Sequence, residues 1–189
     1  MSQPCVRGRR GVTLIELLIV VAMIGILAAI ALPKLSGESF RLAAQSRALA
    51  STLAGAQRLA ISLQNDVRVT FVEAQRRVEI HEDRDNDGTR DAGERVRSLP
   101  LDDGIVFGRG AAGALTLTSG GTATAAISLA NSEIVFRRDG SANQSGAVFV
   151  RVARDAATSP RARAVEVVRA TGRPFVWKHG GATGWQRAQ

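Results

Sequence analysis

The stretch RRGVTLIELLIVVAMIGILAAIALPKL, residues 9–35, decides how the rest of the chain is interpreted. Residues 12–32 carry a single charge, on Glu16, and thirteen of these 21 residues are Val, Ile or Leu. A helix of that length measures about 31 Å, close to the roughly 30 Å of a bilayer core. We therefore expect residues 12–32 to form a membrane-spanning helix.

Insertion of residues 12–32 into a membrane is favoured in spite of Glu16. Thirteen aliphatic side chains at about −0.3 to −0.6 kcal/mol each favour insertion by about 4 to 8 kcal/mol, whereas one acid costs about 2.5 to 3.5 kcal/mol even at the centre. Arg7, Arg9 and Arg10 precede the apolar run and supply +3 of the net charge of +8. Because positive flanks stay inside, the N-terminus should be cytoplasmic and the bulk of the chain should cross the membrane.

Three interpretations of this segment remain open. A secretory signal cleaved at Ala29-Ile30-Ala31 would have an unusually long apolar region, and it gives Glu16 no purpose. A plain signal anchor accounts for everything except Glu16. The third interpretation takes Gly11-Val12-Thr13-Leu14-Ile15-Glu16 as one unit, followed at a fixed distance by Pro33.

This unit resembles the prepilin leader of type IV pilins and type II secretion pseudopilins. In that family a prepilin peptidase cuts on the cytoplasmic side after a glycine and methylates the new N-terminus. The resemblance assigns these positions to Gly11 and Val12, although phenylalanine is usual where this chain has Val12. The family's fifth mature residue is a glutamate and its twenty-second a proline, which correspond to Glu16 and Pro33.

A purpose for Glu16 follows from its setting. A lone carboxylate in hydrocarbon is stabilised by a positive partner, and a freshly cleaved chain carries an α-amino group at Val12. Helices packed side by side can place Glu16 of one subunit against the amine of its neighbour. Such pairs add little net stability but fix register. The alternative is an acid tolerated near the interface by snorkelling.

The remainder of the chain predicts an α+β fold, with one long N-terminal helix packed on an antiparallel sheet domain. Pro33 should kink the helix, which continues through residues 33–63 as an amphipathic segment. Its expected apolar stripe comprises Phe40, Leu49, Leu53, Ala56, Ala60 and Leu63. From Asn65 the apolar period becomes two, and glycine clusters separate the candidate strands. These lie at 67–71, 78–80, 95–99, 105–107, 114–117, 127–129, 133–136, 148–152, 165–168 and 175–178.

Two short motifs extend the resemblance into the sheet domain. Phe136-Arg137-Arg138-Asp139-Gly140 is similar to the strand and Asp-Gly turn of the GspH/FimT branch of minor pilins, and Thr171-Gly172-Arg173 to its C-terminal Gly-Arg. The implied organisation is a leader at 1–11, a membrane and filament-core helix at 12–32, its continuation at 33–63 and a periplasmic GspH/FimT-like domain at 64–189.

The loop DRDNDGTRDAGE, residues 83–94, fits the calcium-loop pattern D-x-D-x-D-G-x5-E. Its candidate Ca²⁺ ligands are Asp83, Asp85, Asp87, the Thr89 carbonyl, Asp91 and a bidentate Glu94. Against calcium stand Arg84 and Arg90, which reduce the loop charge from −5 to −3, and flanks that are strands rather than helices. The alternative is a solvated acidic β-turn.

The C-terminal end is basic. It contains Arg169, Arg173, Lys178 and Arg187, with Trp177 and Trp185 nearby. Some FimT-like minor pilins bind DNA through Gly-Arg-x-Arg, but here the second arginine is replaced in Gly172-Arg173-Pro174-Phe175. Arg173 and Lys178 are therefore nucleic-acid candidates only under the alternative of a DNA-uptake pilin. Otherwise this end is a solvated edge strand.

An enzyme is not expected. His81 and His179 lie far apart in sequence without a nucleophile motif, and both are expected at the surface. No cofactor is expected beyond the candidate Ca²⁺, and the single Cys5 precedes the apolar run, so no disulfide framework is available.

The resemblance implies a minor pseudopilin at the tip of the type II secretion pseudopilus, assisting export across the outer membrane. Its partners would be other pseudopilins, the prepilin peptidase and the inner-membrane assembly platform. It would sit in the bacterial inner membrane as a single-pass protein with a periplasmic C-terminal domain. One alternative is a FimT-like minor pilin of a type IV pilus, serving assembly or DNA uptake. Another is a calcium-binding periplasmic domain on a plain anchor.

Overall fold

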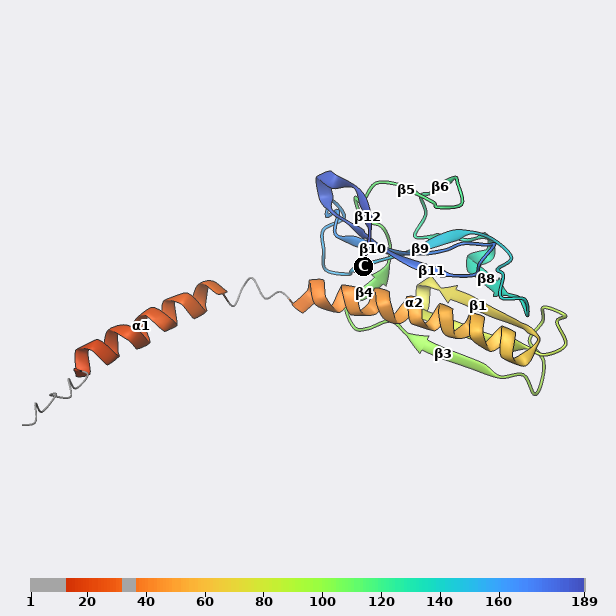
Figure 1. Ribbon diagram of the computed structural model, residues 1–189, viewed down its shortest axis with the longest axis horizontal. Coiled ribbons are helices and arrows are strands. Elements are labelled where there is room, and N and C mark those ends of the chain that lie inside the picture. The colour runs from red at the N-terminus through yellow and green to blue at the C-terminus, as the bar shows by residue number, and fades with distance from the viewer. Residues whose placement is uncertain (1–12, 32–36, 189) are drawn as a thin grey trace, which may run out of the picture. The chain divides into compact units, whose positions relative to one another are not determined.

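The computed structural model describes residues 13–31 and 37–188, which fall into two compact units, Met1–Gly37 and Glu38–Gln189. Among the described residues, the first unit contributes helix α1, and the second contains helix α2 and the β-strands (Figure 1). Gly11, Val12 and Pro33, together with the expected leader, lie outside the described residues. The prediction of a proline kink therefore stays a prediction.

Helix α1 (Leu14–Ala31) begins on a threonine cap. The Glu16 N–H donates to Thr13 Oγ1 at 3.2 Å, and the Leu17 N–H donates to the Thr13 carbonyl at 3.2 Å. A hydroxyl that accepts from the third helical N–H is a standard N-cap. Along the helix, the large apolar side chains from Leu14 to Leu27 are between 50% and 83% exposed. Within the described ranges, no helix combines the length and apolarity needed to cross a membrane.

Helix α2 (Gly37–Leu63) is amphipathic, as predicted, but its buried stripe differs from the expected one. The buried side chains are Leu42, Ala43, Ser46, Leu49, Leu53, Ala56 and Ala60. Phe40 is 73% exposed and Leu63 is 45% exposed, so their assignment to the stripe was wrong. At about 100° per residue Phe40 lies opposite Leu49, and Leu63 is the last residue before the chain leaves the helix.

The strands form two main antiparallel sheets and a small ribbon, a division that the sequence pattern does not reveal. The first sheet has the order β3-β2-β1-β8, from β1 (Asp66–Val72), β2 (Arg77–Asp83), β3 (Val96–Pro100) and β8 (Glu133–Phe136). The second has the order β12-β11-β10-β9-β4, from β4 (Ile105–Phe107), β9 (Gly146–Val152), β10 (Ala162–Val167), β11 (Pro174–His179) and β12 (Trp185–Arg187). In addition, β7 (Ile127–Ser128) pairs with β9, and β5 (Leu115–Thr116) pairs with β6 (Thr122–Ala123).

Three short 3-10 helices complete the second unit: η2 (Glu73–Gln75), η3 (Ala130–Ser132) and η4 (Gly181–Thr183). The α+β class with antiparallel sheets is confirmed. Strands β6 and β12 were not predicted, because they are only two and three residues long and so carry little periodic signal.

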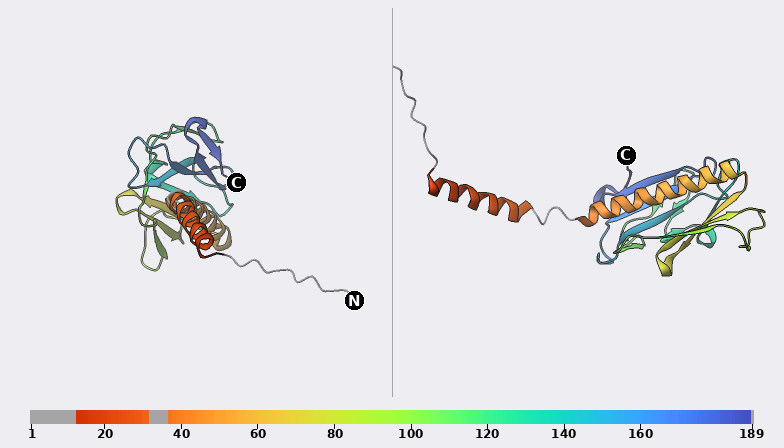
Figure 2. Two further views of the ribbon diagram at one scale, coloured as in Figure 1. Left: turned by 90° about the vertical axis from the view of Figure 1, so that its left-hand side faces the viewer. Right: turned by 90° about the horizontal axis from the view of Figure 1, so that it is seen from below.

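The main core joins α2 to both sheets, and Figure 2 shows α2 running along them. Leu53 of α2, Phe136 of β8 and Val150 of β9 are completely buried in one cluster. An edge-to-face contact between Phe71 of β1 and Phe107 of β4, with ring centroids 6.1 Å apart, links the two sheets directly. The second unit thus has a core of its own.

Candidate functional site

The loop between β2 and β3 starts from the polar face of the first sheet. Along β2, Val78 and Ile80 are buried in the main core. Because successive side chains of a strand point to opposite faces, His81 and Asp83 lie on the other face. There His81 is the cross-strand partner of Arg68 on β1. A histidine, an aspartate and an arginine are thereby gathered where the loop begins.

Asp83 is the buried anchor of this group. Its side chain is completely inaccessible to solvent, and Oδ2 accepts hydrogen bonds from Arg68 Nε at 2.8 Å and from the Gly88 N–H at 3.1 Å. The other end of the guanidinium pairs with Glu133 of β8, with 3.1 Å between Nη1 and Oε1. Arg68 therefore lies beneath the loop and holds one Asp83 oxygen.

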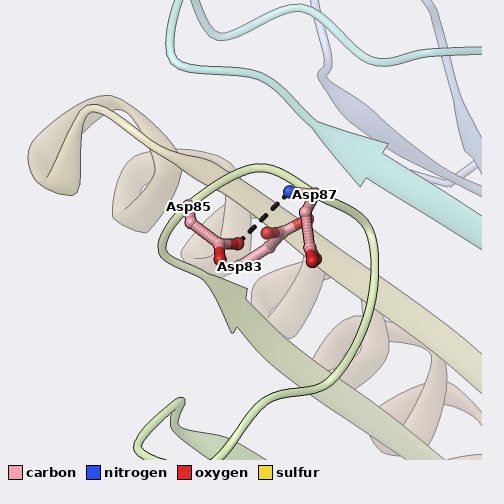
Figure 3. Close-up of side chains that lie close together, drawn as sticks. All are labelled: Asp83, Asp85 and Asp87. Carbon is pink, nitrogen blue, oxygen red and sulfur yellow. Dashed lines mark hydrogen bonds between the residues drawn. The ribbon is translucent and has the colours of Figure 1, made fainter.

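Asp85 and Asp87 converge on Asp83 from the loop, as Figure 3 shows. One carboxylate oxygen from each of the three residues lies within 4.8 Å of the other two. The Asp87 N–H donates to Asp85 Oδ1 at 3.3 Å, and the Thr89 N–H donates to Asp87 Oδ1 at 2.7 Å. The hydrogen bond from that N–H, with one from the Thr89 hydroxyl, holds the pKa of Asp87 below its usual range.

The loop backbone is shaped for this convergence. Asn86 has a φ of 61°, and its Oδ1 accepts from the Asp66 N–H at 2.6 Å, which ties the loop tip to the start of β1. Gly88 has a φ of 84°, and a Cβ there would lie 2.7 Å from an Arg68 Nη2 atom. Glycine therefore meets both the left-handed backbone and the close approach to Arg68.

Glu94 closes the loop instead of joining the three aspartates. Its carboxylate accepts from the Arg84 N–H at 2.7 Å and from the Asp91 N–H at 3.1 Å, and it forms a short contact with His81 Nε2. The hydrogen bond with His81, aided by those two N–H groups, lowers the pKa of Glu94 to about 2. The loop end is thus fixed to β2.

The expectation of a surface His81 was wrong. The residue is only 9% exposed, because the loop folds back and lays the Glu94 side chain, itself 6% exposed, against the imidazole. No local sequence pattern predicts this contact, because the two residues are thirteen positions apart and an irregular loop lies between them.

The loop concentrates negative charge. The charge of Asp87 is the largest cause raising the pKa of Asp91 above its usual range, and reduced contact with water and the charge of Asp85 add to it. Arg84 and Arg90 are exposed. Of the six predicted ligand residues, the structure brings Asp83, Asp85 and Asp87 together. Of the other three, Glu94 contacts His81 instead, the Asp91 N–H donates to Glu94, and the Thr89 hydroxyl donates to Asp87.

The nucleic-acid candidates are not brought together. Arg173 directly precedes β11 and Lys178 is near its far end, about 16 Å away at some 3.3 Å per residue. Lys178 is the cross-strand partner of Arg163, and Arg173 lies 6.0 Å from the Phe175 ring centroid.

Both indole groups of this region are hydrogen-bonded inside the domain. Trp177 Nε1 donates to the buried Glu166 at 2.9 Å, and Trp185 Nε1 donates to the Gly113 carbonyl at 2.7 Å. Glu166 also accepts from the Thr118 N–H at 2.6 Å and hydroxyl at 2.9 Å. These bonds join β10, β11 and the β5–β6 ribbon, which is a structural role.

The two glycine motifs of the sheet domain meet on α2. Gln57 Nε2 donates to the Gly140 carbonyl and to the Thr171 carbonyl, both at 2.6 Å. Gly172 has a φ of 61°, and a Cβ there would lie 2.2 Å from the Gly140 oxygen. One glutamine therefore joins turns 83 and 114 residues away from it, a convergence that the sequence does not show.

The remaining candidate, Glu16, stands in the first turn of α1 with its side chain exposed. Its N–H donates to the Thr13 hydroxyl, and Thr13-x-x-Glu16 has the spacing of a capping box, a local signal that was not used to predict the start of the helix. Residues 6–32 match the prokaryotic N-terminal methylation motif. This motif is type IV prepilin-like, and it includes Gly11, Val12 and Glu16. Comparison with curated proteins and with solved structures gives no match.

Proposed function

We propose that this chain is a minor pseudopilin, a structural subunit of a type II secretion pseudopilus positioned in its tip complex. The observation that carries the proposal is the N-terminal methylation motif at residues 6–32, which indicates a type IV pilin-like protein. In the proposal, a prepilin peptidase cuts after Gly11 and methylates Val12. Proteins with this kind of motif are structural and not enzymes.

The exposed apolar surface of α1 supports an anchor that later becomes part of a filament. Eleven large apolar side chains between Leu14 and Leu27 are at least half exposed, and they surround the helix. A helix that is apolar on all sides is covered by lipid or by other helices. In the proposal, residues 12–32 cross the inner membrane with the N-terminus in the cytoplasm, and the assembly platform moves the subunit into the filament.

Glu16 then has a partner in the neighbouring subunit. Its backbone N–H is already satisfied by Thr13, while its carboxylate is exposed. Inside a bundle of apolar helices, that carboxylate is stabilised by the methylated amine that cleavage creates at Val12 of the next subunit. The pair fixes the axial register, because any slip leaves a charge buried without a partner.

The second unit supplies the part that faces the periplasm. It has its own core and antiparallel sheets. In the proposal, this GspH/FimT-like domain contacts other pseudopilins at the filament tip.

The processing step is tested by the intact mass of protein recovered from membranes, with and without the prepilin peptidase. We expect peptidase-dependent loss of residues 1–11 and a gain of one methyl group in the wild type, and full-length chain for Gly11→Asp. Cleavage after Ala31, or full-length protein in the presence of the peptidase, would overturn the proposal.

The assembly step is tested with Glu16→Gln, which removes the charge and retains the shape. We expect this variant to be cleaved normally and to remain in the membrane, with little of it recovered in the filament fraction. Glu73→Gln, at an exposed position in η2, is the matched control and should assemble. Equal assembly of Glu16→Gln and the wild type would contradict the role of the carboxylate.

The secretion assignment is tested by deleting the chain from its host. Deletion should abolish release of extracellular enzymes while surface type IV pili persist. Normal enzyme release combined with lost pili or lost DNA uptake would replace the pseudopilin by a type IV minor pilin.

A further inference from the structure

The buried carboxylate of Asp83 has one oxygen without a partner. Oδ2 is held by Arg68 and by the Gly88 N–H, but Oδ1 is inaccessible to water and accepts no hydrogen bond from any described residue. Leaving a buried polar atom unpaired costs about 1 to 3 kcal/mol, and more for a charged group. The side chain points toward Asp85 and Asp87, as Figure 3 shows.

We propose that Asp83, Asp85 and Asp87 bind one Ca²⁺ ion, with Asp83 Oδ1 as the buried ligand and water completing the coordination. The proposal rests on two observations: each of the three carboxylates has one oxygen within 4.8 Å of the other two, and Asp83, whose side chain points toward Asp85 and Asp87 (Figure 3), has a buried oxygen without a partner. It does not depend on the proposed function.

The spacing of the oxygens suits this ion. Ca²⁺ binds oxygen at 2.3–2.6 Å, so two ligands on opposite sides of one ion are about 4.6 to 5.2 Å apart. The three oxygens all lie within 4.8 Å of one another, so all three can bind one Ca²⁺ ion after small movements. Mg²⁺ requires near-ideal octahedral geometry at about 2.0–2.1 Å, whereas Ca²⁺ accepts flexible geometry.

The charges around the site also favour a divalent cation. Arg68 offsets one negative charge, but it does so on the Oδ2 side of Asp83 and is shared with Glu133. Asp85 and Asp87 are both exposed, and neither forms an ion pair among the described residues. A cation between the three carboxylates would neutralise the negative charge that Arg68 does not offset.

Glu94 acts as a positioning residue in this proposal. Its carboxylate is occupied by His81 and by the N–H groups of Arg84 and Asp91, so it holds the loop in shape and does not bind the ion. With three protein ligands, the affinity should fall in the range of extracellular calcium modules, with a Kd of about 10⁻⁴ to 10⁻³ M.

The test is calcium titration calorimetry on the full-length chain in detergent, after removal of metals with a chelator and at constant ionic strength. We expect saturable binding of one Ca²⁺ per chain. Asp85→Asn and Asp87→Asn should each weaken binding at least tenfold. Because both positions are exposed, these variants should fold, whereas Asp83→Asn breaks the pair with Arg68 and is avoided.

The matched control is Asp139→Asn. Asp139 accepts hydrogen bonds from the N–H and hydroxyl of Ser141, as Asp87 does from Thr89, but it lies beside Arg137 and not beside other carboxylates. The control should bind Ca²⁺ as the wild type does.

A second readout is the midpoint of thermal unfolding followed by tryptophan fluorescence, since both tryptophans lie in the second unit. Ca²⁺ should raise the midpoint in the wild type and in the control, but not in Asp85→Asn or Asp87→Asn. The proposal is overturned by an absence of saturable binding up to 10 mM Ca²⁺ (roughly ten times the weakest expected Kd). It is also overturned by equally tight Mg²⁺ binding, or by affinity that the two variants leave unchanged.

Discussion

The two helices of this chain differ in how far their apolar side chains are buried. Helix α2 carries a stripe of seven buried residues on one side and packs it against two sheets. Helix α1 is apolar on all sides, and its large side chains from Leu14 to Leu27 are at least half exposed. A stripe is satisfied inside one domain, whereas an apolar surface that surrounds a helix needs lipid or other helices.

The beginnings of the helices differ as well. Helix α1 starts on Thr13, a neutral cap that uses neighbouring residues alone. At the start of α2, Glu38 pairs with Arg154 and Arg161, which lie between β9 and β10. Helix α2 is therefore fixed to its own domain by packing and by ion pairs, whereas the described cap of α1 uses only residues of its own first turn.

The largest expected effect is that of truncating the α2 stripe. Leu53 is completely buried, so Leu53→Ala should reduce the free energy of unfolding of the second unit by about 2 to 5 kcal/mol. The matched change in α1 is Leu18→Ala, at a side chain that is 61% exposed, and it should leave that value unchanged. Urea unfolding of the full-length chain in detergent, followed by tryptophan fluorescence, measures both. A loss of more than about 1 kcal/mol for Leu18→Ala would break the comparison, since exposed positions rarely exceed about 0.5 kcal/mol.

The second effect concerns the turn on which α2 rests. In Gly172→Ala the new Cβ would meet the Gly140 oxygen at 2.2 Å and Gln57 Nε2 at 2.6 Å, at a φ of 61°. We expect a loss of about 2 to 4 kcal/mol, from left-handed backbone strain together with overpacking. Gly25→Ala in α1 is the control, because a Cβ there meets nothing within 4 Å. Wild-type stability for Gly172→Ala would show that α2 is not held by this turn.

Much of this arrangement could be predicted from the sequence, for local reasons. The N-terminal methylation motif at residues 6–32 is a property of one continuous segment, and the period-two pattern around Val67 and Val69 lies within one strand. The amphipathic character of α2 and its end at Leu63 were predicted correctly. Assigning Phe40 to the buried side was wrong, because near-multiples of three and four drift around the helix over nine residues.

The rest depends on contacts that are distant in sequence. The burial of His81 comes from Glu94 across an irregular loop, and the two glycine motifs find a common partner only because Gln57 lies between them in space. The spacing of the carboxylates in residues 83–94 indicated a candidate calcium loop. Which of its carboxylates converge was not predictable, because that depends on Arg68 beneath it and on where Glu94 is held.

The third effect is a pH dependence at the start of α2. Arg161 hydrogen-bonds to Asp155, which lowers the pKa of that carboxyl below its ordinary 3.8, and Arg161 also pairs with Glu38 at 3.1 Å. Because the folded state favours the charged form of Asp155, its contribution is present above about pH 4 and is lost as the pH falls through the folded pKa. Asp155→Asn should therefore destabilise the second unit by about 1 kcal/mol at pH 7, and the difference from the wild type should shrink below pH 4. Urea midpoints at pH 7, 5, 4 and 3 measure this, and a difference that stays constant with pH would contradict it.

The smallest effect has the opposite sign. Gly55 is in the middle of α2 and Gly25 is in the middle of α1, and a Cβ at either position meets nothing within 4 Å. Alanine removes the backbone entropy cost of a helical glycine, so Gly55→Ala should raise the free energy of unfolding of the second unit by about 0.5 to 1 kcal/mol. Gly25→Ala should leave that quantity unchanged, since α1 belongs to the other unit. If Gly25→Ala instead impairs filament incorporation while Gly55→Ala does not, the surface of α1 around Gly25 contacts a neighbouring helix too closely for a methyl group. Tolerance of both substitutions would mean that the apolar surface of α1 is covered without close contact at this position.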